Sequence, residues 1–157
     1  MPRVFRIRRA RTSDVDALVA LEETTFDHDR VSRTQWRRHL RSESASVLVG
    51  ERSGKPIGCV LLFFRRGTST ARLYSIAVAR RARGQGLGAA LLRAAEREAR
   101  RRGCESMRLE VRTDNPAAIA LYEKHGYRRG ECAAGFYENG ADAWRYRKAL
   151  TSVTGAG

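Results

Sequence analysis

Three glycines stand at two-residue spacing, Gly84, Gly86 and Gly88, between an apolar run at residues 73–78 and a long alanine-rich segment. Glycine costs a helix roughly 1 kcal/mol relative to alanine, so its use where a helix begins needs a reason. A strand, a glycine-rich turn and a helix start form an anion site, because backbone N–H groups point outward and the helix dipole favours negative charge. Arg83 adds a positive charge just before the turn. The pattern predicts a diphosphate-binding turn.

Two named nucleotide-binding patterns fit these glycines poorly. Gly84, Gly86 and Ala89 satisfy the loose dinucleotide fingerprint, with Glu105 about 20 residues further on. A dinucleotide-binding unit normally opens a parallel sheet, whereas this turn follows several strands and too little chain remains for the second half of such a fold. The Gly-Lys-Ser/Thr of a P-loop is missing. A different kind of diphosphate turn, or a turn that binds nothing, remains.

Hydrophobic periodicity predicts the elements that position this turn. The expected strands are residues 4–10, 46–51, 56–64, 71–78, 106–111, 127–134 and 142–150. The expected helices are residues 11–26, a short helix beginning after Ser32, a helix between Gly88 and Gly103, and residues 114–126. This order indicates a mixed α/β sheet in one domain, residues 1–150, followed by a flexible tail at residues 151–157.

Three of these helices carry capping signals at their N-termini. Ser13 is a candidate cap of the first helix, and Ser32 with Gln35 three residues later forms a capping-box pattern. Asn115 followed by Pro116 is typical of a cap and a first helical position.

Composition bounds the class of protein. A chain of 157 residues, 42% of them apolar, is expected to form one globular domain with a real core. The longest apolar run, residues 59–64, is too short to span a membrane, and the N-terminal residues lack the apolar block of a signal peptide. We therefore expect a cytoplasmic protein without a membrane partner.

The formal net charge of +14 has two interpretations. It favours attraction to nucleic acid, the ribosome or another polyanion. It equally fits the arginine, alanine and glycine usage of a GC-rich genome, since the arginines are spread along the whole chain. The chain also lacks the aromatic-interleaved basic stretch of single-strand binders, so nucleic-acid contact stays an unspecific expectation.

The cysteines predict neither a disulfide framework nor a metal site. Cys59, Cys104 and Cys132 are odd in number and widely separated, which favours reduced and mostly buried thiols. The three histidines do not pair with them at ligand spacing, so no metal is expected.

Two stretches are similar to motifs of a known family. The acetyl-CoA-binding motif of the GNAT N-acetyltransferase superfamily, Arg/Gln-x-x-Gly-x-Gly/Ala, resembles residues 76–92, IAVARRARGQGLGAALL, through Arg83, Gly86 and Gly88. Residues 109–127, LEVRTDNPAAIALYEKHGY, resemble the branch that contains ribosomal-protein alanine N-acetyltransferases. The resemblance implies a single-domain fold with a mixed, mostly antiparallel sheet flanked by helices and an acetyl-CoA cleft between strands four and five.

The resemblance also implies which residues hold acetyl-CoA as cosubstrate. The backbone of Ile76, Ala77 and Val78 would bind the pantetheine arm and the thioester carbonyl, and Asn115 would reach the pantetheine region. Asn115 also keeps its interpretation as a helix cap. Arg83 precedes the turn that would bind the pyrophosphate, which comprises Gly84, Gln85, Gly86, Leu87, Gly88 and Ala89.

Acetyl transfer from a thioester to an amine needs a base for the ammonium and gains from an acid at the departing thiolate. By resemblance, Glu110 would be the base, acting through water, and Tyr122 the acid toward the CoA sulfur. From the residues alone two other interpretations stay open. Glu110 could be a solvated charge paired with Arg108 or Arg112, and Tyr122 could be a core aromatic on its helix.

The sequence says less about the acceptor amine. In this fold it enters between the first two helices and the last hairpin, where Asp27, Asp29 and Glu138 could hold an amine or simply occupy turns. Tyr137 could line the entry, and Phe136-Tyr137 stands where the alanine-acetylating branch has Tyr-Tyr. Acetylation of a peptide or protein amine, on an N-terminus or a lysine and with a ribosomal protein among the candidate acceptors, is the leading hypothesis. The alternatives are a small-molecule amine acetyltransferase and a non-enzymatic domain that binds RNA or the ribosome.

Overall fold

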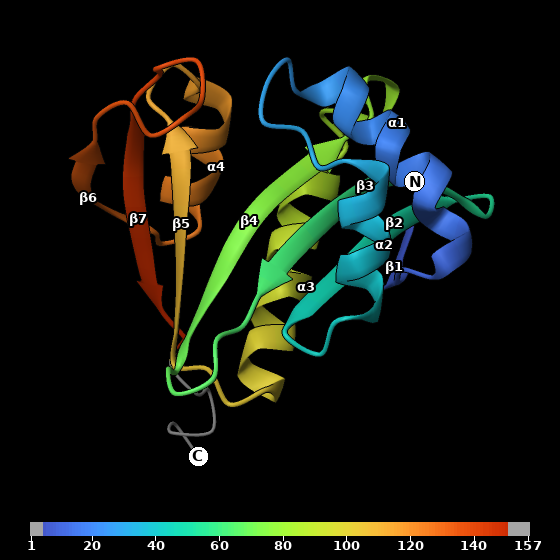
Figure 1. Ribbon diagram of the computed structural model, residues 1–157, viewed down its shortest axis with the longest axis horizontal. Coiled ribbons are helices and arrows are strands. Elements are labelled where there is room, and N and C mark those ends of the chain that lie inside the picture. The colour runs from blue at the N-terminus through green and yellow to red at the C-terminus, as the bar shows by residue number, and fades with distance from the viewer. Residues whose placement is uncertain (1–4, 151–157) are drawn as a thin grey trace.

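The computed structural model describes residues 5–150, so the predicted tail lies outside the described residues. Within that range the chain forms seven strands, four α-helices and two short 3-10 turns (Figure 1). The strands are β1 (Arg6–Arg9), β2 (Ala45–Arg52), β3 (Lys55–Phe63), β4 (Thr70–Val78), β5 (Ser106–Arg112), β6 (Arg128–Ala133) and β7 (Ala143–Ala149). The helices are α1 (Val15–Thr25), α2 (Arg33–Arg41), α3 (Leu87–Arg101) and α4 (Pro116–Lys124), with turns η1 (Thr12–Asp14) and η2 (Arg80–Ala82).

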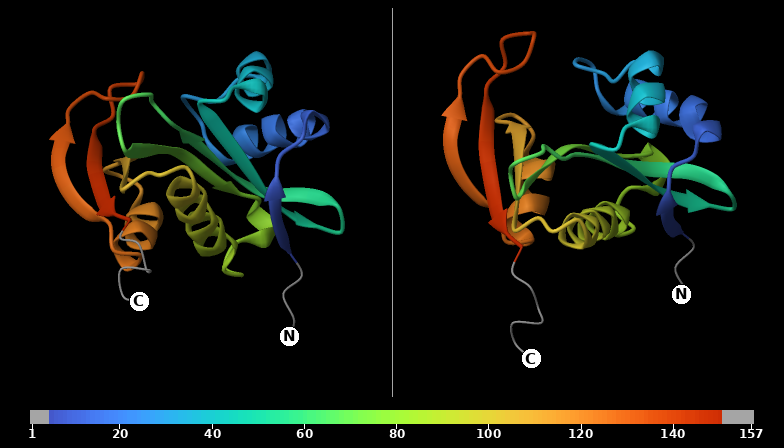
Figure 2. Two further views of the ribbon diagram at one scale, coloured as in Figure 1. Left: turned by 90° about the horizontal axis from the view of Figure 1, so that it is seen from below. Right: turned by 60° about the horizontal axis from the view of Figure 1, so that its bottom comes forward.

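All seven strands belong to one sheet in the order β1-β2-β3-β4-β5-β7-β6. Neighbouring strands are antiparallel except β4 and β5, which are parallel. Figure 2 shows α1 and α2 on one face of the sheet and α3 and α4 on the other. The predicted mixed, mostly antiparallel sheet flanked by helices is therefore confirmed. None of the described helices has the length and apolarity needed to cross a bilayer.

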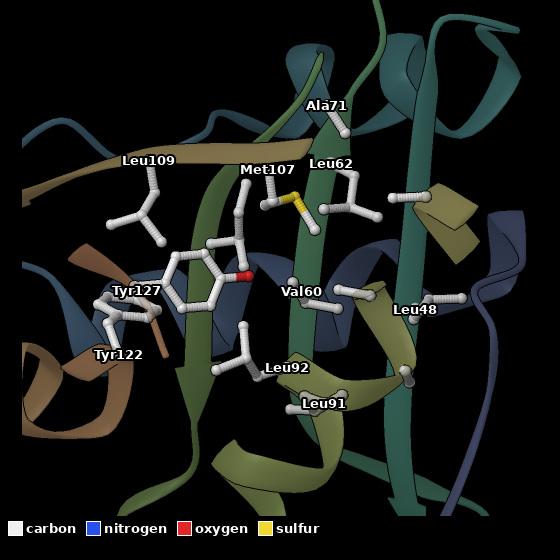
Figure 3. Packing of buried hydrophobic residues seen from close by; sticks show 14 of the residues in the cluster. Leu48, Val60, Leu62, Ala71, Leu91, Leu92, Met107, Leu109, Tyr122 and Tyr127 are labelled. Atoms are coloured by element: carbon white, nitrogen blue, oxygen red, sulfur yellow. The ribbon is translucent and has the colours of Figure 1, made fainter. Parts of the chain in front are cut away.

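Each face of the sheet buries its own apolar cluster. The cluster under α3 and α4 is the larger and joins strand residues such as Val60, Leu62 and Leu109 to Leu91 and Leu92 of α3 (Figure 3). The cluster under α1 and α2 is built around Leu18, Trp36, Val49, Cys59 and Leu61. Burial of both faces explains why β2 and β3 read as nearly continuous apolar runs.

The parallel pair β4 and β5 is joined over only part of its length. Its register runs from Thr70 opposite Ser106 to Leu73 opposite Leu109, and no pairing follows. Beyond this point β4 continues to Val78 beside β3 alone, while β5 continues beside β7 alone. In Figure 1 the two strands meet at one end and separate at the other. The sheet therefore opens between its fourth and fifth strands.

A β-bulge marks the place where β4 leaves β5. Leu62 pairs with Leu73, but the preceding Leu61 pairs with Ser75, so Tyr74 has no partner residue on β3. A bulge bends its strand and increases the local twist, which turns the second half of β4 away from β5. The extra residue also points the Tyr74 ring toward Phe63, with ring centroids 5.3 Å apart.

The start of α3 is fixed on the sheet by one leucine. Leu87 is only 1% exposed and lies over β2 and β3 where both strands carry glycine. A Cβ on Gly50 would stand 2.6 Å from the Leu87 Cδ1 atom, and a Cβ on Gly58 would stand 2.8 Å from its Cδ2 atom. Because real Cβ atoms do not approach so closely, these two glycines leave the space that Leu87 fills.

Two of the three predicted helix caps are confirmed. Ser32 Oγ accepts a hydrogen bond from the Gln35 backbone N–H at 3.1 Å, and Asn115 Oδ1 accepts one from the Ala118 N–H at 3.2 Å. The prediction of Ser13 as a cap is wrong, because the η1 turn precedes α1. There the carboxylate of Asp14 accepts from the Arg11 N–H at 2.7 Å.

The three cysteines are free thiols, and their burial differs. Cys59 is buried, Cys104 is half-buried and Cys132 is exposed. The prediction of mostly buried thiols is wrong for Cys132, because it lies on β6 at the edge of the sheet, where no further strand covers it.

Glu22 is a buried acid near the C-terminal end of α1. Its side chain is enclosed by the α1–α2 layer, where Oε1 accepts a hydrogen bond from the Val31 N–H at 2.6 Å. Its Oε2 atom has no hydrogen-bond partner among residues 5–150. Burial raises the pKa of Glu22 from its ordinary 4.5 to about 7, against the opposing effects of the Val31 N–H and the Arg30 charge.

This buried acid predicts a pH dependence of stability. Between pH 4.5 and 7 the folded chain keeps the Glu22 proton and the unfolded chain releases it, so the free energy of unfolding falls as pH rises. The loss contributed by Glu22 is on the order of 3 kcal/mol. Glu22→Gln keeps an acceptor for Val31 and stays neutral, so it should match the wild type at pH 4.5 and exceed its stability at pH 8.

Urea denaturation at the two pH values measures this difference. Glu23→Gln is the matched control, because Glu23 is the exposed neighbour on the same helix. The interpretation of Glu22 is wrong if the Glu22→Gln variant loses as much stability between pH 4.5 and 8 as the wild type does.

Candidate active site

The glycine turn after β4 presents a row of unused backbone donors. Gly84 and Gly86 have φ of +77° and +83°, a left-handed conformation that glycine adopts without strain. Gly86 is the N-cap of α3 and has no side-chain cap. In the part of the chain that the structure describes, the N–H groups of Gly84 and Gly86 have no backbone acceptor, and those of Leu87, Gly88 and Ala89 lie in the first turn of α3, where a helix provides no acceptor. Successive unused donors at a helix N-terminus form an anion site.

The charge around the turn matches this site. Residues 79–95 contain arginines but no acid. Arg83 is exposed, and its Nε donates to the Val78 carbonyl at 3.3 Å, which ties the guanidinium to the end of β4. An anion at the turn therefore meets backbone dipoles and positive side chains without a competing carboxylate.

Gly88 lies inside the first turn of α3 and faces α4. A Cβ added there would contact Leu121 at 3.8 Å and Val78 at 4.0 Å, which is ordinary packing. The protein itself therefore has room for a methyl group at this position.

The opened sheet gives β4 an unpaired edge next to the turn. Ile76, Ala77 and Val78 pair with Val60, Cys59 and Gly58 of β3, and no strand pairs with their other edge. An unpaired strand edge can bind an extended ligand through its backbone N–H and C=O groups. Asn115 stands at the start of α4, and its Oδ1 is used in the cap already described.

Tyr122 lies on α4, and its side chain is buried in the larger apolar cluster. Its ring packs edge-on against Tyr127, with centroids 5.8 Å apart, and both rings lie near Leu109 in Figure 3. Its hydroxyl has no hydrogen-bond partner among residues 5–150, yet it is not one of the fully enclosed unpaired atoms. Burial, and secondarily the Tyr137 hydroxyl, raises the pKa of Tyr122 above its ordinary 10, so the phenol stays protonated.

Glu110 lies on β5 beyond the point where β4 departs. Its side chain is 6% exposed and is surrounded by arginines. Arg72 and Arg108 approach the carboxylate to 3.0 and 3.1 Å, and Arg145 lies at 3.8 Å. Of the alternative interpretation, the pairing with Arg108 is observed, but the carboxylate is buried and not solvated, and Arg112 pairs with Asp114 at 3.1 Å. Arg72 and Arg145 were not predicted as partners of Glu110. They reach it because β4 and β7 flank β5 in the sheet.

Aromatic and acidic residues from distant segments meet near Glu110. Burial first, and then the nearby carboxylates of Glu110 and Asp29, raise the pKa of Tyr137 to about 12 against the Arg112 charge. Burial likewise raises the pKa of Tyr74 against the Arg72 charge, with smaller contributions from Glu22, Asp29 and Glu138. The α1–α2 loop and the β6–β7 loop therefore face one another across this end of the opening.

Tyr74 belongs to this group and was not predicted from the sequence. It is 38% exposed, with the Arg72 guanidinium 5.4 Å from its ring centre. A strand that alternates regularly would not place Tyr74 and Ser75 as the bulge does, and nothing in the local sequence announces the bulge. Among residues 5–150 no group of His, Cys, Asp and Glu side chains could hold a metal ion.

Comparisons with known proteins agree with this geometry. Residues 10–127 match the model of the Acetyltransferase (GNAT) family. An N-alpha-acetyltransferase of Sulfurisphaera tokodaii is 29% identical over 89% of this chain and 90% of its own length. The crystal structure of the ribosomal-protein-S18-alanine N-acetyltransferase from Escherichia coli has a TM-score of 0.83 and 27% identity, covering 95% of this chain and 96% of that one.

A second solved structure is similar in fold. A chain of the NatC complex, whose crystal structure has Gag peptide and CoA bound, has a TM-score of 0.79 and 24% identity over 94% of this chain and 99% of its own. The resemblance noted in residues 76–92 and 109–127 is thereby confirmed at the level of the family and of its ribosomal-protein-alanine branch. The chain belongs to the acetyltransferase (GNAT) family and is an enzyme that acetylates amines.

Proposed function

We propose that this protein transfers the acetyl group of acetyl-CoA directly to a primary amine of a peptide or protein, an N-terminal α-amine or a lysine. The observation that carries the proposal is the row of free backbone donors at residues 84–89, which opens onto the unpaired edge of β4. The similar proteins named above include acetyltransferases of protein N-termini and of a ribosomal protein, which favours a protein acceptor.

The cosubstrate would lie along β4 in the opening. The N–H groups of Gly84, Gln85, Gly86, Leu87, Gly88 and Ala89 bind its pyrophosphate, assisted by Arg83. The free edge of Ile76, Ala77 and Val78 holds the pantetheine arm and polarises the thioester carbonyl. Asn115 offers its amide N–H₂ to the same arm while its oxygen caps α4.

The proposed chemistry needs three proton transfers and no covalent intermediate on the protein. The acceptor ammonium gives a proton through water to Glu110, and the free amine attacks the thioester carbon. A C–N bond forms, the C–S bond breaks, and Tyr122 gives its phenolic proton to the departing sulfur. The new amide nitrogen then gives its second proton to the Tyr122 phenolate, which restores the phenol. The raised pKa of Tyr122 keeps that proton available until negative charge develops on sulfur.

The arginines around Glu110 fix the orientation of its carboxylate. Arg72 and Arg108 hold the carboxylate by hydrogen bonds to its two oxygens, so its position is fixed. The Asp29 carboxylate acts on the pKa of both the Tyr74 and the Tyr137 hydroxyl, which puts one negative charge within electrostatic reach of two aromatic side chains. An ammonium group is stabilised by both kinds of neighbour, which supports an amine acceptor entering between the two loops.

The acceptor class is tested by measuring free CoA released with three sets of acceptors. The sets are peptides with a free N-terminus, lysine peptides with a blocked N-terminus, and small amines such as polyamines. The proposal predicts faster turnover with peptides, and blocking the reactive amine of the best peptide should abolish it. Turnover confined to small amines would support the small-molecule alternative instead.

Arg83 should contribute to binding of the diphosphate alone. Arg83→Gln removes one charge-assisted contact, so the dissociation constant of CoA should rise about tenfold or more. The KM for S-acetylpantetheine, which lacks the diphosphate, should stay unchanged. Arg66→Gln, an exposed change in the β3–β4 turn, is the matched control. Equal weakening of CoA and of S-acetylpantetheine by Arg83→Gln would contradict the placement of the pyrophosphate.

Tyr122 and its ring neighbour Tyr127 allow a paired test of the acid. Tyr122→Phe keeps the packing and removes a hydroxyl without a protein partner, so kcat should fall about 10²-fold while CoA affinity and stability change little. Tyr127 Oη donates to Glu96 at 2.9 Å in the core. Tyr127→Phe should therefore cost about 1–3 kcal/mol of stability and leave kcat nearly unchanged.

The kcat of each variant is measured by steady-state kinetics, and its stability is measured by thermal melting. If Tyr122→Phe keeps wild-type turnover on a good acceptor, Tyr122 is a packing residue and the acid lies elsewhere.

A further inference from the structure

The exposed side of α2 carries an unusual concentration of positive charge. The nine residues of α2, RTQWRRHLR, include four arginines and no acid. Arg33, Arg37 and Arg41 stand at four-residue spacing, so they line one side of the helix at intervals of about 6 Å. Like charges at this spacing destabilise a helix. The fold therefore keeps a charge pattern that its own stability opposes.

These arginines line a groove on the molecular surface. One hollow of about 590 Å³ is lined by Thr34, Arg37, Arg38, Arg41 and Ser42. A second hollow of about 380 Å³ is lined by Thr12, Ser13, Val15, Asp16, Arg33, Arg37 and Arg41. The two hollows are adjacent because they share Arg37 and Arg41, and we call this surface between the start of α1 and the length of α2 the α2 groove.

Most of the charge in the α2 groove is not neutralised within the protein. Its one acid, Asp16, pairs with Arg33. Arg37, Arg38 and Arg41 form no ion pair with any described residue; the Arg41 Nε donates only to the Arg37 carbonyl, at 3.3 Å. Elsewhere in the protein one carboxylate pairs with several arginines, as Glu98 does with Arg9, Arg101 and Arg102.

The chemistry of the α2 groove fits phosphates. Guanidinium groups bind phosphate oxygens in a bidentate manner. The hydroxyl residues Thr12, Ser13, Thr34 and Ser42 add donors for phosphates and partners for ribose 2′-hydroxyls. Of the described residues, the exposed large apolar ones are Tyr74 and Phe136, which lie outside the groove. The groove therefore lacks the apolar anchors that a peptide or a membrane surface would use.

The aromatic residue of α2 cannot serve as a stacking platform. Trp36 is fully buried in the core beneath the helix. Single-stranded nucleic acid is usually held by bases stacked on exposed aromatic rings, whereas a duplex is held by its backbone. The groove thus favours a double helix over a single strand.

We propose that the α2 groove binds the phosphate backbone of double-stranded RNA. The arginines of the α2 groove contribute part of the net charge of +14, and the proposal gives that part a function. The helices that line the groove, α1 and α2, cover the face of the sheet opposite α3 and α4 (Figure 2). The α2 helix directly follows the α1–α2 loop that faces the acceptor end of the opening. A protein acceptor bound to structured RNA would be held beside that opening. The proposal does not depend on the acetyl-transfer chemistry.

The test measures binding of a short labelled RNA duplex by fluorescence anisotropy over a series of KCl concentrations. The test variant is Arg37→Gln/Arg38→Gln/Arg41→Gln. The control variant is Arg93→Gln/Arg97→Gln/Arg100→Gln, which removes the same charge from the solvent side of α3, on the opposite face of the sheet. Thermal melting and acetylation of a short peptide establish that both variants are folded and active.

The α2 variant should bind RNA about tenfold more weakly or worse at 0.1 M salt, and its slope of log affinity against log salt should fall by about three. The α3 variant should change the slope by less than one third of that. Equal losses of RNA affinity in the two variants would mean that only the net charge of the protein matters, and this would overturn the proposal. Binding of a DNA duplex or of polyglutamate as tightly as RNA, with the same loss in the α2 variant, would also overturn it.

Discussion

The end of the ladder between β4 and β5 is the constraint on which the rest of the structure depends. Parallel strands that pair from Thr70–Leu73 with Ser106–Leu109 and then separate leave an unpaired edge inside a sheet. Unpaired buried backbone groups are costly, so such an edge persists only where a ligand or water satisfies it. The bulge at Tyr74 bends β4 away, and β7 occupies the other side of β5. The opening is therefore built into the strand pairing and does not depend on a mobile loop.

Two further contacts hold the two sides of the opening in place. Leu87, seated over Gly50 and Gly58, fixes the start of α3 and with it the turn of free N–H groups. On the other side, Glu96 of α3 accepts hydrogen bonds from Tyr127, which follows α4, and from Lys148 of β7 at 2.9 and 3.0 Å. This buried network ties the C-terminal half of the sheet to α3. A site that binds a long ligand gains affinity when both walls are pre-organised in this way.

Local signals predicted much of this fold, and long-range pairing accounts for what they missed. The Ser32–Gln35 box, the Asn115–Pro116 helix start and the glycine turn each act within a few residues, so the sequence shows them directly. The bulge at Tyr74 comes from the register with β3, and the Arg72 and Arg145 contacts to Glu110 come from the order of β4, β5 and β7. Neither is visible in one strand alone. The site residues themselves came from family resemblance more than from pattern, because Glu110 and Tyr122 look ordinary in isolation.

The central claim is that acetyl-CoA is held by the free backbone groups of the turn and of the β4 edge. Amide hydrogen exchange with and without CoA measures those groups one by one. The account predicts slower exchange at residues 84–89 and along residues 76–78 when CoA binds, with little change on α2. CoA that binds tightly while exchange at both segments stays unchanged would contradict it.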